Sequence, residues 1–207
     1  ALIWPLACPN CTIYHHAMKR LTYMLVMLLP LMVWGSVMGS GGARADQTDP
    51  RLGDLFGKLH ALEDPRQARI IEQLIWGVWL ESKSPPLQLL MGRVIKAMAQ
   101  RKLAQALELL HSVVAVAPDY AEGWNKRATV YFMMGDYKAS IADVERTLAL
   151  EPRHFGALSG LGLIYTRLKD NAGALEAYER ALLVNPHLGQ AKAEIKRLKR
   201  KVKGEEI

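Results

Sequence analysis

The chain has 207 residues, of which 50% are hydrophobic, 23% charged and 7% aromatic. This composition is typical of a globular protein and excludes a disordered chain, a collagen-like fibre and a polytopic membrane protein. Two cysteines are too few for a scaffold built on disulfides, so the fold must rest on a hydrophobic core.

The formal net charge of +7 is concentrated at the two ends of the chain. Lys19, Arg20 and Arg44 lie before the first acidic residue, Asp46. Residues 190–207 hold seven basic and three acidic side chains, whereas the stretch between these ends has 17 of each sign. This charge balance over residues 46–189 argues against the broad basic surface of a nucleic-acid-binding domain, so we expect no nucleic-acid partner.

From Met18 onward the sequence has the order of a secretory signal. A positively charged start is followed by an apolar stretch over residues 21–38, a glycine-rich exit and the small-residue pattern Ala43-Arg44-Ala45. We expect a signal peptide over residues 18–45, cleaved after Ala45, and a periplasmic protein. The alternative is an uncleaved anchor in the inner membrane, but Pro30 in the apolar stretch favours a removable signal over a spanning helix.

Residues 1–17 precede the charged start of this signal. We interpret them as a translation start assigned too early and expect them to be disordered. Cys8 and Cys11, with His15 and His16 nearby, have the spacing of a redox pair or of half a zinc site. The further ligands or the strand–helix–strand context that such sites need are missing from the sequence pattern, so we expect no metal and no cofactor.

The chain repeats itself with a period of 34 residues. Pro118, Pro152 and Pro186 are separated by this interval, and small or apolar side chains recur with it. The matched positions are Ala106, Ser140 and Ala174; Leu107, Ile141 and Leu175; and Leu110, Val144 and Tyr178. Three units follow, over residues 87–120, 121–154 and 155–188. Such a period is the signature of a solenoid, because one unit cannot bury its apolar face without a neighbour.

Each unit has the pattern of two helices. In the second unit Trp124, Ala128 and Tyr131 follow one another at helical spacing, and Gly135 marks a turn. A second apolar stripe comes after the turn, at Ile141, Val144 and Leu148. Pro152 then ends the second helix, because proline has no amide hydrogen to donate.

These residues resemble the tetratricopeptide repeat (TPR). The second unit carries the motif at Trp124, Ala128, Tyr131, Gly135 and Pro152, and the third at Gly162, Tyr165, Ala174, Tyr178 and Pro186. The first unit departs from it, since Ala97 stands where tyrosine is usual and Arg101 where the turn glycine is usual. The resemblance implies an all-α fold, a right-handed superhelical solenoid of antiparallel helix pairs.

Helices are also expected on both sides of the repeats. Residues 46–86 predict an N-terminal helix pair, in which Asp64 and Pro65 are typical of a helix start, and we interpret the pair as a degenerate repeat or lid. Residues 189–207 predict a basic C-terminal capping helix. We favour a solvated cap that keeps the end of the solenoid soluble; the alternative is peripheral contact with an anionic membrane surface.

The sequence lacks the patterns that carry common catalytic chemistry. It has no phosphate-binding loop with its lysine and no histidine pair of the zinc-protease type, and Gly160-Leu161-Gly162 lacks the third glycine of a nucleotide fingerprint. We therefore expect no enzyme and no catalytic residue.

The resemblance implies instead that the first helix of each unit lines a concave groove for a peptide or helix of another protein. The expected lining is Gln88, Met91, Ile95, Met98, Glu122, Asn125, Thr129, Phe132, Met133, Ser159, Leu163, Thr166 and Arg167. Methionines adapt to varied apolar partners, but Met98 and Met133 are equally consistent with filling gaps between repeats. The predicted function is a non-catalytic scaffold of the cell envelope. The alternative is a membrane-tethered assembly factor that keeps its N-terminal helix and uses the basic C-terminal helix.

Two further features of the groove can be judged from the sequence. The family's carboxylate clamp is incomplete, because Gly156 and Gly160 stand where its cations are expected, and we do not carry it over. Arg93 and Arg127 are 34 residues apart, at a place where the third unit has an apolar residue. We favour a structural role in which they pair with acids such as Asp143, over the binding of an anionic partner group.

Overall fold

The computed structural model describes residues 49–82 and 84–202, which lie within one compact unit. Its helices are α2 (Pro50–Ala61), α3 (Pro65–Leu80), α4 (Pro85–Ala99), α5 (Leu103–Val116), α6 (Ala121–Met134), α7 (Tyr137–Leu150), α8 (Phe155–Arg167), α9 (Asn171–Val184) and α10 (Gly189–Val202). The expected signal peptide and residues 1–17 lie outside the described residues. Within residues 49–82 and 84–202, every helix is too short or too polar to cross a bilayer.

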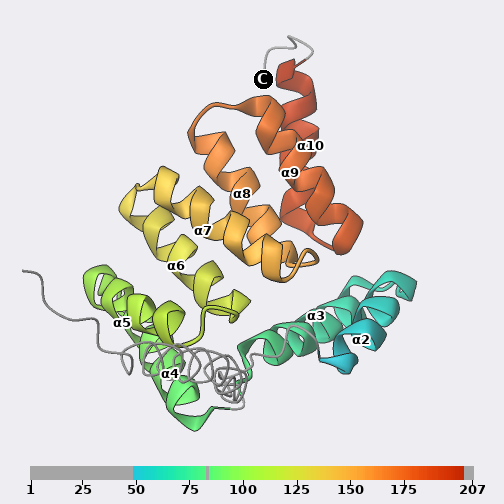
Figure 1. The fold of residues 1–207 in the computed structure, drawn as a ribbon. Coiled ribbons are helices and arrows are strands. Elements are labelled where there is room, and N and C mark those ends of the chain that lie inside the picture. The colour runs from blue at the N-terminus through green and yellow to red at the C-terminus, as the bar shows by residue number, and fades with distance from the viewer. Residues whose placement is uncertain (1–48, 83, 203–207) are drawn as a thin grey trace, which may run out of the picture. The chain divides into compact units, whose positions relative to one another are not determined.

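The helices from α4 to α9 form three antiparallel pairs, one in each 34-residue unit. Each helix packs against the next along the chain, so the pairs stack in sequence order (Figure 1). Pro118, Pro152 and Pro186 occupy the same place in the three pairs, one residue after the C-cap of α5, α7 and α9. The expected all-α solenoid of helix pairs is confirmed.

The turn inside each pair has one backbone design, repeated three times. Arg101, Gly135 and Lys169 all have a positive φ, of 56°, 83° and 63°. The next residue donates its amide to a carbonyl five positions earlier, as in Asp136 N to Tyr131 O at 2.9 Å and Asp170 N to Tyr165 O at 2.9 Å. This is a Schellman ending, which reverses the chain tightly and usually takes glycine at the left-handed position. The first unit therefore makes the family turn with an arginine.

Small residues allow the two helices of a pair to approach closely. A Cβ on Gly162 would lie 2.8 Å from the ring of Tyr178, which fills the space that the glycine leaves. In the second pair Ser140 takes the equivalent place of Ala174, and its hydroxyl donates to the carbonyl of Ala128 at 2.7 Å. The 34-residue recurrence of small side chains thus reflects helix contact.

The α2–α3 hairpin does not stack on the first repeat as a degenerate repeat would. Its apolar face packs instead on the third repeat, where Phe56 and Trp79 enclose Phe155, and Val184 and Leu188 join the same core. Two histidines fix the contact: His187 Nε2 lies 3.0 Å from the carbonyl of Leu59, and His60 Nε2 lies 2.9 Å from that of Val184. The aromatic residues of α3 account for this placement, because they find their apolar partners on α8.

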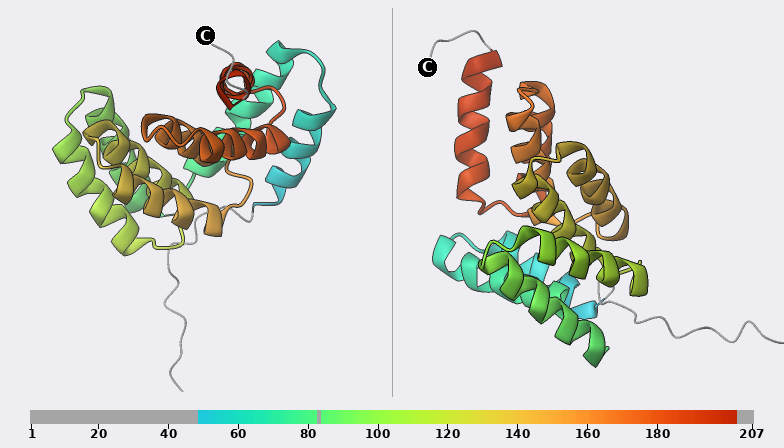
Figure 2. Two further views of the ribbon diagram at one scale, coloured as in Figure 1. Left: turned by 90° about the horizontal axis from the view of Figure 1, so that it is seen from above. Right: turned by 90° about the vertical axis from the view of Figure 1, so that its left-hand side faces the viewer.

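The last helix, α10, covers the end of the stack. Ala191 and Leu198 are buried against α9, with Ile195 packed beside them, and Figure 2 shows the two helices side by side. Lys199 pairs with Glu179 of α9 at 2.8 Å. The basic residues occupy the sides of the helix that remain in solvent.

Candidate partner-binding groove

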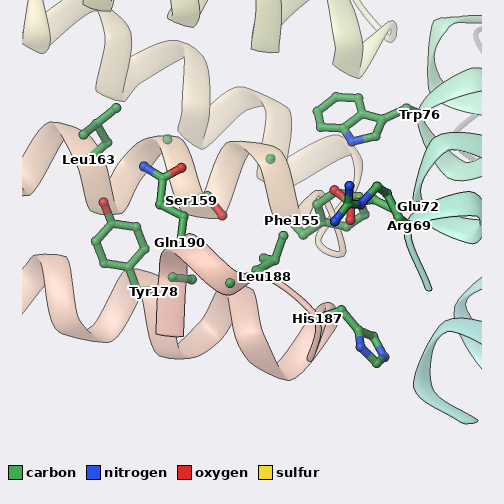
Figure 3. Close-up of a pocket in the computed structure, with 14 residues that line it drawn as sticks. Arg69, Glu72, Trp76, Phe155, Ser159, Leu163, Tyr178, His187, Leu188 and Gln190 are labelled. Atoms are coloured by element: carbon green, nitrogen blue, oxygen red, sulfur yellow. The ribbon is translucent and has the colours of Figure 1, made fainter. Parts of the chain in front are cut away.

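Two adjoining pockets lie along the first helices of the second and third repeats. The smaller, of about 100 Å³, lies between α6 and α8 and is lined in part by Thr129, Phe132 and Leu163. The larger, of about 430 Å³, is bounded by α3, α8 and α10 (Figure 3). Gly156, Gly160 and Leu163 line both pockets. We call this continuous surface the groove.

The floor of the groove is unusually bare at two glycines of α8. A Cβ on Gly160 would meet nothing within 4 Å, so this position opens directly into the groove. A Cβ on Gly156 would instead collide with Trp76, whose Cζ2 would be 2.7 Å away. The absence of side chains here lets another backbone approach α8 closely. The ring of Trp76 occupies the space beside Gly156, whereas the space beside Gly160 is free.

Trp76 of α3 forms the wall at that end. Its ring meets Phe155 edge to face, with centroids 5.5 Å apart, and the Lys126 ammonium lies 5.1 Å from its centroid. Glu72 and Arg69, one and two turns earlier on α3, stand beside it at the rim (Figure 3). The hairpin therefore contributes an aromatic wall and a charged rim to a groove whose floor belongs to the repeats.

A buried polar network lies beneath the groove. The carboxylate of Glu122 is completely buried; Oε2 accepts from Asn125 at 2.8 Å and lies 3.0 Å from His154 Nε2. Lys126, one turn later on α6, forms an ion pair with Oε1. Burial by itself raises the pKa of Glu122, but the charge of Lys126 and the hydrogen bond from His154 outweigh it and leave this pKa below its ordinary value. Glu122 is therefore an ionised, fully paired group.

His154 joins this network to the start of α8. Its Nδ1 accepts the amide hydrogen of Ala157 at 3.1 Å, so the side chain is the N-cap of α8. Because Nδ1 is an acceptor, the proton of the neutral ring is on Nε2, from which it is donated to Glu122. One buried imidazole thus satisfies both a helix end and a buried carboxylate.

The predicted groove residues fall into three groups. Asn125, Thr129, Phe132, Ser159 and Leu163 line the two pockets. Met91 and Glu122 are not accessible to a partner. Met91 is 1% exposed within the core of the first repeat, and the buried carboxylate of Glu122 is already paired with Lys126. The others, Gln88, Ile95, Met98, Met133, Thr166 and Arg167, lie outside both pockets.

Three of these outlying residues have identifiable contacts, one of which is the hydrogen bond from the Thr166 hydroxyl to the carbonyl of Gly162 at 2.8 Å. Met98 is half-buried against the core of the first repeat, which matches the gap-filling alternative, whereas Met133 is 38% exposed. Gln88 accepts a hydrogen bond from the amide of Ser82 at 3.0 Å and so fastens the link between α3 and α4. The outlying residues are on the expected helices, but the two pockets do not extend as far as their side chains.

Sequence reasoning missed the part of the groove that comes from the flanking helices. Arg69, Trp76, Leu188 and Gln190 line the larger pocket and belong to α3 or to the region around the start of α10. The helix pair expected over residues 46–86 includes Trp76 and Trp79, but nothing in the sequence identified the third repeat as its partner. Within the described part of the chain, no three His, Cys, Asp or Glu side chains gather as metal ligands would.

Arg127 has the structural role that we favoured. Its guanidinium makes two hydrogen bonds to Asp143, at 2.7 and 2.8 Å, and lies 4.8 Å from the ring centroid of Trp124. This pair bridges the two helices of the second repeat, and Arg127 does not line either pocket of the groove.

Comparison with known proteins agrees with this architecture. A sequence profile of the tetratricopeptide repeat matches residues 92–142 and 126–191. A TPR repeat-containing protein of Rhizobium etli is 40% identical over 154 residues, which cover 74% of this chain and 76% of the relative. The relationship therefore extends over most of both chains.

Two solved structures share the fold. The Sgt2 TPR domain from Aspergillus fumigatus superposes with a TM-score of 0.55 at 26% identity, covering 58% of this chain and 81% of that domain. The first TPR of Spaghetti (RPAP3), solved with the HSP90 peptide SRMEEVD, has a TM-score of 0.54 at 22% identity, covering 56% and 92%. The repeat motifs, the helix pairs and these matches together show that the chain belongs to the tetratricopeptide repeat family.

Proposed function

We propose that this protein is a non-catalytic scaffold that holds a segment of a partner protein in the groove of α6 and α8. The TPR is a protein-interaction fold, and the RPAP3 domain of the same fold was solved with a bound peptide. The observation that carries the proposal is the open strip at Gly160, where two pockets meet and no side chain covers the helix. A partner backbone can approach there and place apolar side chains against Phe132 and Leu163 on either side.

The test is to fill the strip without disturbing the fold. Gly160→Leu projects a side chain into open groove, and replacing a mid-helix glycine favours folding by about 0.5–1 kcal/mol. Gly57→Leu on α2 is the matched control, since a Cβ there also meets nothing within 4 Å and Gly57 lines neither pocket. Both variants are expected to be at least as stable as the wild-type protein.

Affinity capture from a cell extract then compares the wild-type chain with the two variants. We expect proteins that the wild type and Gly57→Leu retain and Gly160→Leu loses. A photoreactive residue at Thr129, which lines the smaller pocket, should crosslink to the same proteins. Equal recovery of every captured protein by folded Gly160→Leu and by the wild type would contradict the proposal.

We also propose that the scaffold works in the cell envelope, after export through the signal-like segment over residues 18–45. The charged start, apolar middle and Ala43-Arg44-Ala45 pattern support this. Cell fractionation with N-terminal sequencing tests it. A soluble periplasmic form that begins at Asp46 is the expected result, a full-length form in the membrane fraction favours the tethered alternative, and a cytoplasmic form excludes both.

A further inference from the structure

The outer side of α10 carries a straight basic stripe. Lys192, Lys196 and Arg200 recur every four residues and therefore lie in one line along the helix, and all three side chains are exposed. Among the described residues, none of the three forms an ion pair with a carboxylate, whereas Lys199 pairs with Glu179 and Arg197 with Glu194. The stripe is thus a set of uncompensated positive charges.

Lys192, at the start of the stripe, lies on the side of α10 away from the groove. Ala191 and Leu198 hold the apolar side of α10 against α9, and Gln190 lines the larger pocket. At 100° per residue, Gln190 and Lys192 lie on opposite flanks of that apolar side. A partner in the groove and a surface that meets the stripe would therefore not compete for the same face.

An exposed leucine lies on the face of α9 that meets Lys199 of α10. Leu183 is 77% exposed, which is the highest value among the exposed large hydrophobic residues of the described chain. It follows Glu179 by one helical turn on the same face of α9, and Glu179 is the residue that pairs with Lys199 of α10. Cations that flank a free apolar side chain are the arrangement that suits a membrane interface.

We propose that the face formed by Lys192, Lys196, Arg200 and Leu183 binds anionic phospholipid headgroups at a membrane surface. Charge complementarity supports this occupant, because residues 46–189 have balanced charge and the stripe supplies the local positive field. Nucleic acid is less favoured, since α10 offers no aromatic side chain for base stacking. The helix stays docked on α9, so the contact is peripheral.

The first test is acetylation footprinting of the full chain, with vesicles of phosphatidylcholine alone or mixed with phosphatidylglycerol. Lys192 and Lys196 should be acetylated severalfold more slowly when phosphatidylglycerol is present, and Lys138 of α7 should be unaffected. This readout is specific to α10 even if residues 1–48 bind bilayers of both compositions. Equal acetylation rates of Lys192 and Lys196 with the two vesicles would overturn the proposal.

The second test compares two triple variants of equal net charge by co-sedimentation. Each cation near an anionic surface contributes roughly fivefold to partitioning, so Lys192→Gln/Lys196→Gln/Arg200→Gln should lose about a hundredfold of the phosphatidylglycerol-dependent binding. Lys58→Gln/Lys102→Gln/Lys138→Gln, which alters exposed cations on α2, in the turn before α5 and on α7, should keep it. Equal losses by both variants, or stronger protection of Lys192 and Lys196 by duplex DNA than by the vesicles, would refute a lipid-binding face.

Discussion

The indole of Trp79 lies flat on the imidazole of His154, with ring centroids 4.1 Å apart and planes inclined by 11°. This contact joins α3 to the start of α8, although the two residues are 75 positions apart in the chain. His154 also caps α8 and donates to Glu122, so one imidazole links the hairpin, the third repeat and the buried ion pair of the second. The hairpin and the repeats are consequently expected to unfold together.

Replacing His154 by alanine should cost about 2–4 kcal/mol of unfolding free energy. The variant loses a helix cap and one of the two donors to Oε2 of the buried Glu122 carboxylate, so that only Asn125 still donates to this oxygen. Urea unfolding followed by circular dichroism measures the loss. His111→Ala is the control, because His111 is exposed and contacts only the hydroxyl of Tyr131 among the described hydrogen bonds. Equal stability of the two variants would show that the His154 network contributes little.

Much of the fold is visible in the sequence because its cause is periodic. The same local structural requirements recur every 34 residues. They are met by the prolines, by the small residues Ser140 and Ala174, and by the turn glycine Gly135. The placement of the α2–α3 hairpin has no such signal, since an apolar helix face shows only that something covers it. Trp76 and Trp79 were therefore assigned to a helix but not to their contact with α8.

Five of the thirteen expected lining residues lie beside the two pockets, whereas the chemistry beneath the groove was not visible in the sequence. Glu122 lies on the first helix of its unit, where the family pattern places the lining, yet its carboxylate is buried. Helical spacing does not reveal that Lys126, one turn away, neutralises this charge, or that a hydrogen bond from His154 also makes its burial tolerable. Those partners are set by tertiary packing, which a single sequence does not display.

The buried carboxylate predicts acid sensitivity. Lys126 and His154 face Glu122 and, against the effect of burial, hold its pKa below the ordinary 4.5. The folded state therefore binds fewer protons than the unfolded state at moderately acidic pH. The stabilisation is complete above the unfolded pKa and is lost as pH falls through the folded one, with a limiting slope of about 1.4 kcal/mol per pH unit.

Glu122→Gln tests this linkage. At neutral pH the variant should be less stable than the wild type, because Lys126 keeps its charge and loses its partner. The difference should narrow as the pH is lowered below about 4.5, where the unfolded wild-type carboxylate binds a proton that the folded one still excludes. Urea unfolding over a pH series measures it, and His154 is present in both proteins. A difference that does not change with pH would exclude Glu122 as the titrating group.

Two glycines one turn apart on α8 should respond oppositely to alanine. Gly160→Ala meets open space and should raise the unfolding free energy by about 0.5–1 kcal/mol. Gly156→Ala drives its methyl group into the ring of Trp76 and should lower it by about 1–3 kcal/mol. Thermal unfolding of the two variants, and of Gly156→Ala combined with Trp76→Ala, measures these effects. Trp76→Ala itself should destabilise the protein, because it loses the ring's contact with Phe155, but in that background the further change Gly156→Ala should cost little.

The three left-handed turn positions allow a comparison inside one molecule. Lys169 and Arg101 adopt a conformation that costs a non-glycine residue about 1 kcal/mol or more, although their φ values resemble that of Gly135. Lys169→Gly and Arg101→Gly should therefore each stabilise the protein by about 0.5–1 kcal/mol, the relief of strain exceeding the extra entropy of the unfolded chain. Gly135→Ala should destabilise it by a similar amount, for the same reason with the opposite sign. Both lysine and arginine lie in exposed turns, so loss of their side chains removes no buried contact. Chemical unfolding of the three single variants measures these changes. If Lys169→Gly or Arg101→Gly lowered the unfolding free energy, the original side chain would stabilise the turn by more than its backbone strain costs.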